Sequence, residues 1–128
     1  MEITMWDKVK AIAALDANVA PESLGRCAEF TRKAIEAGGL TLVRCTSAKD
    51  YGASLLAVGF VALTPVPVVY LPGDVGIVQP IPSHPFGHMA MYDGTDWVSD
   101  FRQLHGLYPG AAYRAADPSF TVYRYPDS

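Results

Sequence analysis

The sequence predicts an α+β fold in which N-terminal helices pack on a mainly antiparallel sheet. Segments with helical spacing of apolar residues occupy the first half of the chain, and short strand-like runs joined by Gly- and Pro-rich turns follow from about residue 60. With 128 residues, of which 50% are hydrophobic, the chain is long enough to bury one core. We therefore expect a single domain over residues 1–128.

Three helices are expected in the first half of the chain. Apolar residues at helical spacing mark the first: Met5, Val9 and Ile12. The third begins at Ser47, where Asp50 three residues later resembles a capping box, and Gly59 ends it.

The second helix is expected to carry Cys27 in its first turn. Ser23 and Gly25 are possible N-cap residues, and the glycines at 38–39 end the helix. Helical geometry divides its side chains between an inward face and a face toward water. These are Cys27, Phe30 and Ala34 on the first, and Arg32, Lys33 and Glu36 on the second.

Strands are expected in the second half, because β-branched and aromatic runs alternate there with turn residues. The predicted ranges are 60–63, 66–70, 75–78, 88–92, 97–101 and 120–125.

Residues 88–101 read as a hairpin around the turn signal Asp93-Gly94. If the loop is 93–95, His88 lies opposite Asp100; a loop one residue shorter or longer would place Ser99 or Phe101 there instead. Alternation of apolar residues favours the first register. It predicts an apolar face of Met89, Met91, Trp97 and Phe101, and a second face, packed on the Cys27 helix, of His88, Ala90, Val98 and Asp100.

Cys27, His88 and Asp100 together predict nucleophilic catalysis by a thiol. The positive end of a helix dipole and a neighbouring imidazolium can lower the pKa of a thiol, and a carboxylate can fix the imidazole tautomer. Taken singly, these residues are more often a small buried hydrophobe, a core histidine and a surface carboxylate. Their order and their placement on the required elements favour the catalytic interpretation.

Three motifs resemble the NlpC-type and CHAP-type branches of the papain-like cysteine amidases. They are the Cys-Ala helix start at 27–28, Pro-Gly-Asp-Val at 72–75 and Gly-His-Met-Ala-Met-Tyr-Asp-Gly at 87–94. The resemblance implies a papain-like core and cleavage, through a thioester, of an amide bond in peptidoglycan stem peptides or cross-links. It also implies Cys27 as nucleophile, His88 as base and Asp100 as third member. Arg-Cys-Ala-Glu at 26–29 departs from the Asp-Cys-Ser-Gly of many NlpC-type enzymes and is closer to CHAP and toxin-like members.

The chain also resembles the amidase effectors that bacteria inject into rival cells by type VI secretion. This resemblance implies a peptidoglycan peptide as substrate, a cognate immunity protein as partner, and action in the periplasm of a target cell. Residues 1–8 lack a basic n-region and Asp16 interrupts the apolar run after them, so no Sec signal is expected. Two alternatives remain open: an acyltransferase or protein deconjugase on the same scaffold, and a non-catalytic binding module.

Composition gives no sign of nucleic-acid or membrane binding. The formal net charge is −3, and the 10 Lys and Arg residues look scattered along the chain rather than clustered. The apolar stretch 60–71 is too short to span a bilayer. We expect no cofactor and no metal, because the histidines lack zinc-helix spacing and the cysteines form no CxxC pair.

Substrate contacts are expected from a loop and from two tyrosines. The proline-rich loop 80–86 directly precedes His88 and could form a wall of the cleft. The candidate substrate-binding residues are His84, Tyr92 and Tyr108. Cys45 is interpreted as a packed, inert thiol, with a Cys27–Cys45 disulfide as a further hypothesis.

Overall fold

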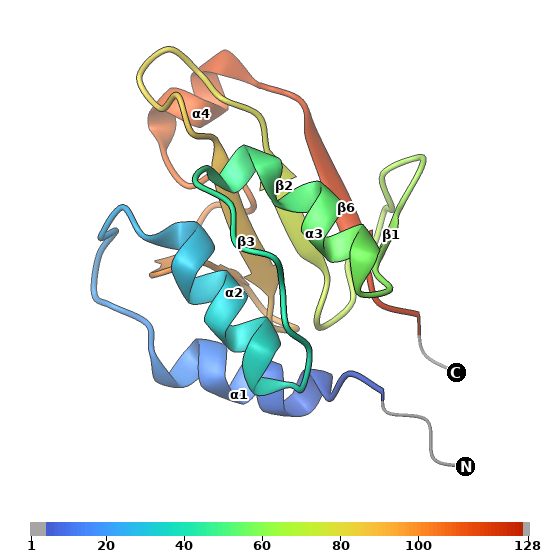
Figure 1. The fold of residues 1–128 in the computed structure, drawn as a ribbon. Coiled ribbons are helices and arrows are strands. Elements are labelled where there is room, and N and C mark those ends of the chain that lie inside the picture. Colours follow the sequence, from blue (N-terminus) through green and yellow to red (C-terminus); the bar gives the residue numbers. More distant parts are fainter. Residues whose placement is uncertain (1–4, 127–128) are drawn as a thin grey trace.

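Three helices cover one face of an antiparallel sheet in the computed structural model, which describes residues 5–126 (Figure 1). The predicted α+β class is confirmed. Residues 1–4, part of the stretch predicted to lack a signal, and residues 127–128 lie outside the described residues. The helices are α1 (Lys8–Ala17), α2 (Cys27–Ala37), the 3-10 helix η1 (Ala48–Asp50), α3 (Tyr51–Ala57) and α4 (Ala111–Ala116).

The sheet has the strand order β1-β6-β2-β3-β4-β5, and every neighbouring pair is antiparallel. β3 therefore lies near the middle of the sheet. The strands are β1 (Val61–Ala62), β2 (Val75–Val78), β3 (His88–Tyr92), β4 (Trp97–Val98), β5 (Arg102–Gln103) and β6 (Phe120–Arg124).

The main core lies between α1, α2, α3 and one face of β2 and β3. Ile35 of α2 and Leu55 of α3 are fully buried against Ile77, Met89 and Met91 of the sheet. The prediction that α2 packs on the His88 face was therefore wrong. The large methionine side chains bury more apolar area than the alternate positions do, and they decide which face the helix covers.

The opposite face of the sheet carries a smaller apolar cluster. It contains Ala90 and Trp97, covered by Leu107 and by Tyr113 of α4. The sequence had placed Trp97 with the methionines and had not predicted α4. The face of Trp97 follows from its pairing with Tyr92 across the hairpin.

The predicted strand 97–101 is split by a turn. Val98 pairs with both Met91 and Arg102, and Ser99 N–H donates to the Phe101 carbonyl across 3.0 Å. The chain thus reverses at residues 99–101. Residues 102–103 then form β5, a separate strand at the edge of the sheet.

Residues 66–70 form a loop rather than the predicted strand. Pro65 and Pro67 lack the N–H groups that a sheet ladder needs, and Val68 is fully exposed. Among residues 5–126, no helix combines the length with the apolar character of a membrane-spanning segment.

Candidate functional site

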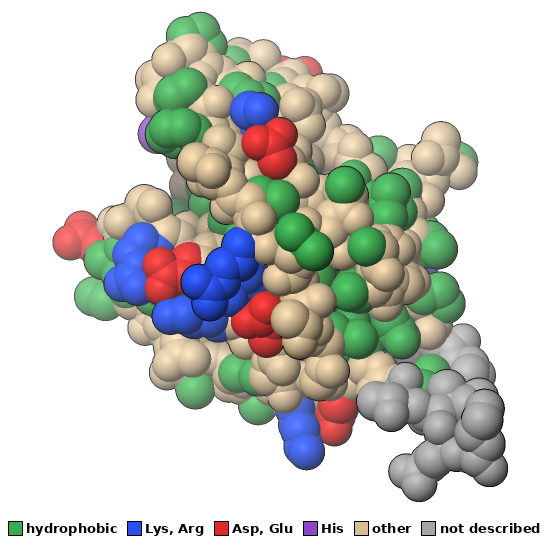
Figure 2. Space-filling model, viewed as in Figure 1, with side chains coloured by type: hydrophobic (Ala, Val, Ile, Leu, Met, Phe, Trp, Pro, Cys, Tyr) green, Lys and Arg blue, Asp and Glu red, His purple; other side chains and the backbone are tan. Residues whose placement is uncertain are grey.

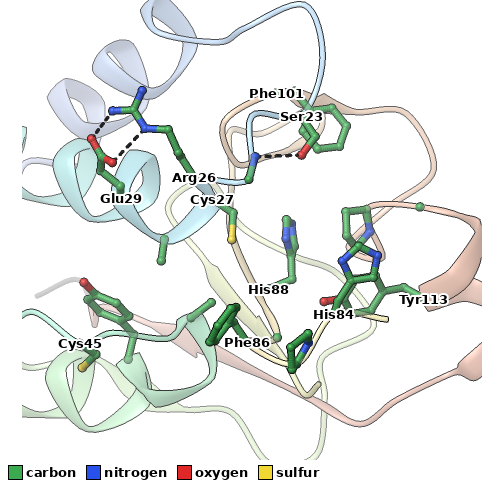
Figure 3. Close-up of a pocket in the computed structure, with 18 of the residues that line it drawn as sticks. Ser23, Arg26, Cys27, Glu29, Cys45, His84, Phe86, His88, Phe101 and Tyr113 are labelled. Carbon is green, nitrogen blue, oxygen red and sulfur yellow. Dashed lines mark hydrogen bonds and ion pairs between the residues drawn. The ribbon is translucent and has the colours of Figure 1, made fainter. Parts of the chain in front are cut away.

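A cleft of about 1090 Å³ opens where α2 begins, and both Cys27 and His88 line it (Figure 3). Its walls come from α2, from the segment that leads into η1, from the loop before β3 and from the start of α4. The predicted loop wall is present, contributed by residues 83–87. In Figure 3 the Cys27 sulfur and the His88 ring lie beside each other, so the structure brings the first two predicted site residues to the same cleft.

Cys27 is the first residue of α2, as the sequence predicted. The N-cap residue Arg26 makes no side-chain cap hydrogen bond, so the first N–H groups of the helix are left for other partners. Burial raises the pKa of the Cys27 thiol, while hydrogen bonds with the backbone of Met89, Ala28 and Cys27 itself lower it. Burial dominates, so the pKa is raised rather than lowered, contrary to the expectation for a helix N-terminus.

Asp100 holds the loop that precedes Cys27. Its Oδ2 accepts hydrogen bonds from Leu24 N–H and Arg26 N–H, each 2.8 Å long, and its side chain is fully buried. Its backbone carbonyl accepts from Ala20 N–H across 2.8 Å. Asp100 therefore fixes the backbone at the entrance to α2, and with it the position of the Cys27 sulfur.

His88 bonds to Gln103, not to the predicted Asp100. The distance from His88 Nε2 to Gln103 Oε1 is 2.6 Å. The Gln103 amide nitrogen donates to the carbonyls of Gly106 and Leu107 at 2.8 and 2.9 Å, which identifies the atom facing His88 as the amide oxygen. Because that oxygen can only accept, His88 Nε2 carries the proton and Nδ1 is the basic nitrogen.

The register explains why Asp100 does not face His88 as predicted. Tyr92 pairs with Trp97, which makes the hairpin loop four residues long instead of three. Asp93 Oδ1 closes this loop by accepting hydrogen bonds from Thr95 N–H and Asp96 N–H at 2.8 and 2.7 Å. The extra residue shifts the pairing by one position, and the turn at 99–101 then ends it.

Burial lowers the pKa of His88 to about 4. The hydrogen bond to Gln103 and the charge of Asp100 act in the opposite direction, and the charge of His84 acts in the same direction as burial. At neutral pH the ring is therefore uncharged. The resting site pairs a neutral thiol with a neutral imidazole.

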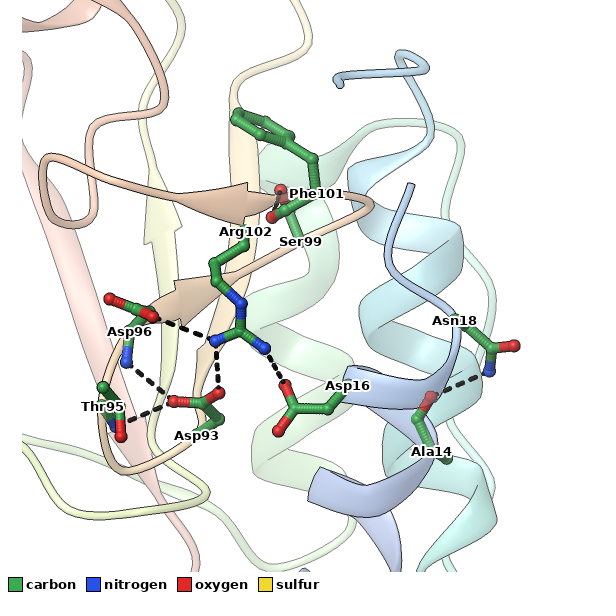
Figure 4. A network of polar contacts seen from close by, with 9 residues as sticks. All are labelled: Ala14, Asp16, Asn18, Asp93, Thr95, Asp96, Ser99, Phe101 and Arg102. Carbon is green, nitrogen blue, oxygen red and sulfur yellow. Dashed lines mark hydrogen bonds and ion pairs between the residues drawn. The ribbon is translucent and has the colours of Figure 1, made fainter. Parts of the chain in front are cut away.

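Arg102, the residue before Gln103, ties β5 to the hairpin loop and to α1 (Figure 4). Its guanidinium donates to Asp93 at 2.9 Å, to Asp96 at 3.0 Å and to Asp16 at 3.2 Å. The Asp93 side chain is only 5% exposed. This network fixes the short edge strand from which Gln103 reaches His88.

Of the three predicted substrate-binding residues, one lies in the cleft. His84 lines it and stacks on Tyr113, with ring centroids 5.1 Å apart. Tyr92 packs against Tyr70 and Trp97, and the Tyr108 hydroxyl lies within hydrogen-bond distance of Asp117 and of the Pro118 carbonyl. Neither tyrosine lines the cleft.

Sequence reasoning missed Gln103 and Tyr113, which both lie beside His88. The Tyr113 ring lies 6.1 Å from the His88 ring, and burial raises the pKa of its hydroxyl to about 12. Tyr113 follows the Pro109-Gly110 turn, but no periodic pattern in a six-residue helix marks it.

Cys45 also lines the cleft, and both cysteines are free thiols. The Cys45 sulfur is 3.4 Å from Ser54 Oγ and 3.5 Å from the Asp50 carbonyl. The Cys45 side chain therefore contacts both η1 and α3. Within residues 5–126, no group of three or more His, Cys, Asp or Glu side chains could hold a metal ion.

Basic residues gather along the α2 side of the cleft, although the sequence suggested that they were scattered. Figure 2 shows Lys and Arg side chains grouped over this helix. The residues lining the cleft include four basic side chains and one acidic one: Arg26, Arg32, Lys33 and Arg44, with Glu29. Arg32 was predicted to point to water but is 6% exposed.

The fold is similar to that of solved structures of a bacterial effector. The chain aligns with the crystal structure of the type VI effector–immunity complex Tae3–Tai3 from Ralstonia pickettii at 54% identity and a TM-score of 0.87, covering 94% of this chain and 100% of that chain. The selenomethionine form of the complex aligns at 55% identity and a TM-score of 0.84, covering 90% and 99%. No protein-family model and no curated protein sequence matches the chain.

Proposed function

This chain belongs to the Tae3 family of type VI effectors, and we propose that it is a peptidoglycan-cleaving cysteine amidase. The observation that carries this proposal is the Cys27 thiol at the start of α2, in the same cleft as a His88 ring whose Nε2 is bonded to Gln103. A thiol, an imidazole and an orienting amide oxygen are the parts that acyl transfer through a thioester requires. This arrangement also supports a place among the papain-like amidases of the NlpC and CHAP type.

In the proposed reaction, His88 Nδ1 takes the thiol proton as the Cys27 sulfur attacks the amide carbonyl. The carbon–nitrogen bond then breaks, and the imidazolium returns this proton to the leaving amine. Water attacks the thioester while His88 Nδ1 accepts its proton, the carbon–sulfur bond breaks, and the thiol and a carboxylic acid are released. The backbone N–H groups at the start of α2 can stabilise the oxyanion in both halves of the reaction.

In this mechanism Gln103 takes the orienting role that the sequence had suggested for Asp100. A hydrogen bond from Nε2 to an uncharged amide oxygen holds the ring and the tautomer without adding a charge. Asp100 acts one step further away, because it positions the loop that carries Cys27.

The whole chain is proposed to act as one catalytic domain in the periplasm of a target cell. The similar structure is an effector bound to an immunity protein, which supports a cognate inhibitor for this chain as well. An inhibitor that enters the cleft at Cys27 would protect the producing cell.

Mass spectrometry of purified peptidoglycan, digested in parallel with the wild-type protein and with Cys27→Ala, tests the proposal. We expect soluble fragments with a newly formed carboxylate and a newly formed amine from the wild type alone. Cys45→Ala is the matched control, because it removes the other thiol of the cleft, and it should release the same fragments. Identical digests from the wild type and from Cys27→Ala would contradict the proposed function.

A further inference from the structure

The cleft is positively charged along its α2 side, in a chain whose formal net charge is −3. Four cationic side chains line it and only one carboxylate does. A cleft lined by one sign of charge raises the local concentration of ligands of the opposite sign. The ligand of this end of the cleft should therefore be anionic.

Two of the four cations share the one carboxylate that lines the cleft. Glu29 lies between Arg26 and Lys33, with ion-pair distances of 2.5 and 2.8 Å. Hydrogen bonds from both neighbours lower the pKa of Glu29 to about 2, so this carboxylate stays ionised at neutral pH. The pairs leave Arg26 and Lys33 with less capacity for a ligand.

The other two cations, Arg32 and Arg44, retain unused donors. Arg32 is only 6% exposed, yet a single ion pair, from Nη1 to Glu36 Oε1 at 2.8 Å, is its one side-chain hydrogen bond to the described residues. Arg44 has no hydrogen bond or ion pair with any residue between 5 and 126, although it lines the cleft. No buried side-chain nitrogen of the described residues lacks a hydrogen-bond partner, so the free N–H groups of Arg32, like those of exposed Arg44, reach the solvent of the cleft, where a ligand can accept from them.

We propose that Arg32 and Arg44 form a carboxylate-binding subsite that receives a free carboxylate of the peptide substrate. Guanidinium groups suit this ligand because their planar forks donate two parallel hydrogen bonds to it. The proposal rests on the proposed amidase function, and it names the feature of the peptide that this cleft selects.

The test compares native muropeptides, released from peptidoglycan by a muramidase, with the same muropeptides after amidation of their carboxylates. We expect Arg44→Gln to lower kcat/KM on the native form by about tenfold, as for the loss of one hydrogen bond to a charged group. Because Arg44 is exposed and unpaired among the described residues, this variant should stay folded. Lys10→Gln is the matched control, since it removes the same charge from α1, away from the cleft.

A second arm measures binding of both muropeptide forms to Cys27→Ala, with and without Arg44→Gln. We expect the native form to bind more tightly than the amidated form. The ratio of their dissociation constants should shrink about tenfold in Arg44→Gln and should be partly restored in Arg44→Lys. Equal binding of the two forms would overturn the subsite while leaving the amidase function intact. A binding difference without cleavage by the wild type would keep the subsite and reject hydrolysis.

Discussion

His88 Nε2 and Gln103 Oε1 lie 2.6 Å apart, and the Gln103 amide nitrogen is anchored to the carbonyls of Gly106 and Leu107. Gln103 is 2% exposed, so no water competes for its oxygen. The backbone of the 103–107 turn thereby sets the orientation of the imidazole. Catalysis should depend on this amide although it lies behind the histidine and does not line the cleft.

Replacing Gln103 by alanine should lower kcat by about tenfold, since one positioning hydrogen bond is worth about 1–1.5 kcal/mol. The freed Nε2 would allow the ring to rotate and to exchange tautomers. KM should change little, because Gln103 does not line the cleft. Steady-state kinetics on muropeptides measures both constants, and exposed Gln79 provides the matched control as Gln79→Ala. An unchanged kcat would reject Gln103 as a positioning residue.

Asp100→Ala should destabilise the protein by roughly 1–3 kcal/mol, because it leaves the N–H groups of Leu24 and Arg26 without their acceptor. Asp100→Asn keeps one oxygen for these two donors and should cost less. Urea unfolding monitored by fluorescence compares the two variants. If Asp100 instead served chiefly as a charged partner of His88, Asn and Ala would lower kcat equally at equal stability.

Local sequence signals were sufficient to predict the elements that carry the nucleophile and the base. Gly25 precedes α2, and the glycines at 38–39 follow it. The predicted ranges 75–78 and 88–92 agree with β2 and β3. Each of these signals acts within one helical turn or one strand. They position Cys27 and His88 correctly on their elements without any knowledge of the tertiary contacts.

The partner of His88 could not be predicted in the same way. The register depends on the Asp93 carboxylate, which closes a loop one residue longer than the Asp93-Gly94 signal suggests. Gln103 reaches the site only because the chain reverses at 99–101, and no periodicity marks a two-residue strand. The basic group on the cleft likewise joins Arg44 to α2 through tertiary packing.

Arg102→Met should destabilise the protein by about 1 kcal/mol and lower kcat as well, because Gln103 is the next residue. The substitution leaves the carboxylates of Asp16, Asp93 and Asp96 without their shared cation. Chemical denaturation at pH 7 measures the loss, and Arg114→Met on the exposed face of α4 is the matched control. The difference in stability between the wild type and Arg102→Met should shrink as the carboxylates become protonated below about pH 4. A pH-independent difference would indicate lost packing instead.

Stability should fall as the pH drops from about 6.5 to about 4, through His88. Its pKa is about 4 in the folded protein against 6.5 in the unfolded chain, so only the unfolded state binds the proton in this window. The stabilisation is complete above pH 6.5 and is lost toward pH 4, by roughly 3 kcal/mol at about 1.36 kcal/mol per pH unit. Denaturation of the wild type and of His88→Gln at each pH isolates this contribution, because the carboxylates titrate in both. Parallel stability curves would contradict a buried, neutral His88.

Alkylation of Cys27 by iodoacetamide should be slow at pH 6 and should rise about tenfold per pH unit through pH 8, because burial keeps the pKa of the thiol above its ordinary value. With the pKa of His88 at about 4, a resting thiolate–imidazolium pair would be only sparsely populated. The measurement uses Cys45→Ala, so that mass spectrometry follows one thiol, and free cysteine provides the reference. A rate that is already at its plateau at pH 6 would show that the charged pair exists in the free enzyme. In that case the proton transfer to His88 would precede substrate binding instead of accompanying attack on the carbonyl.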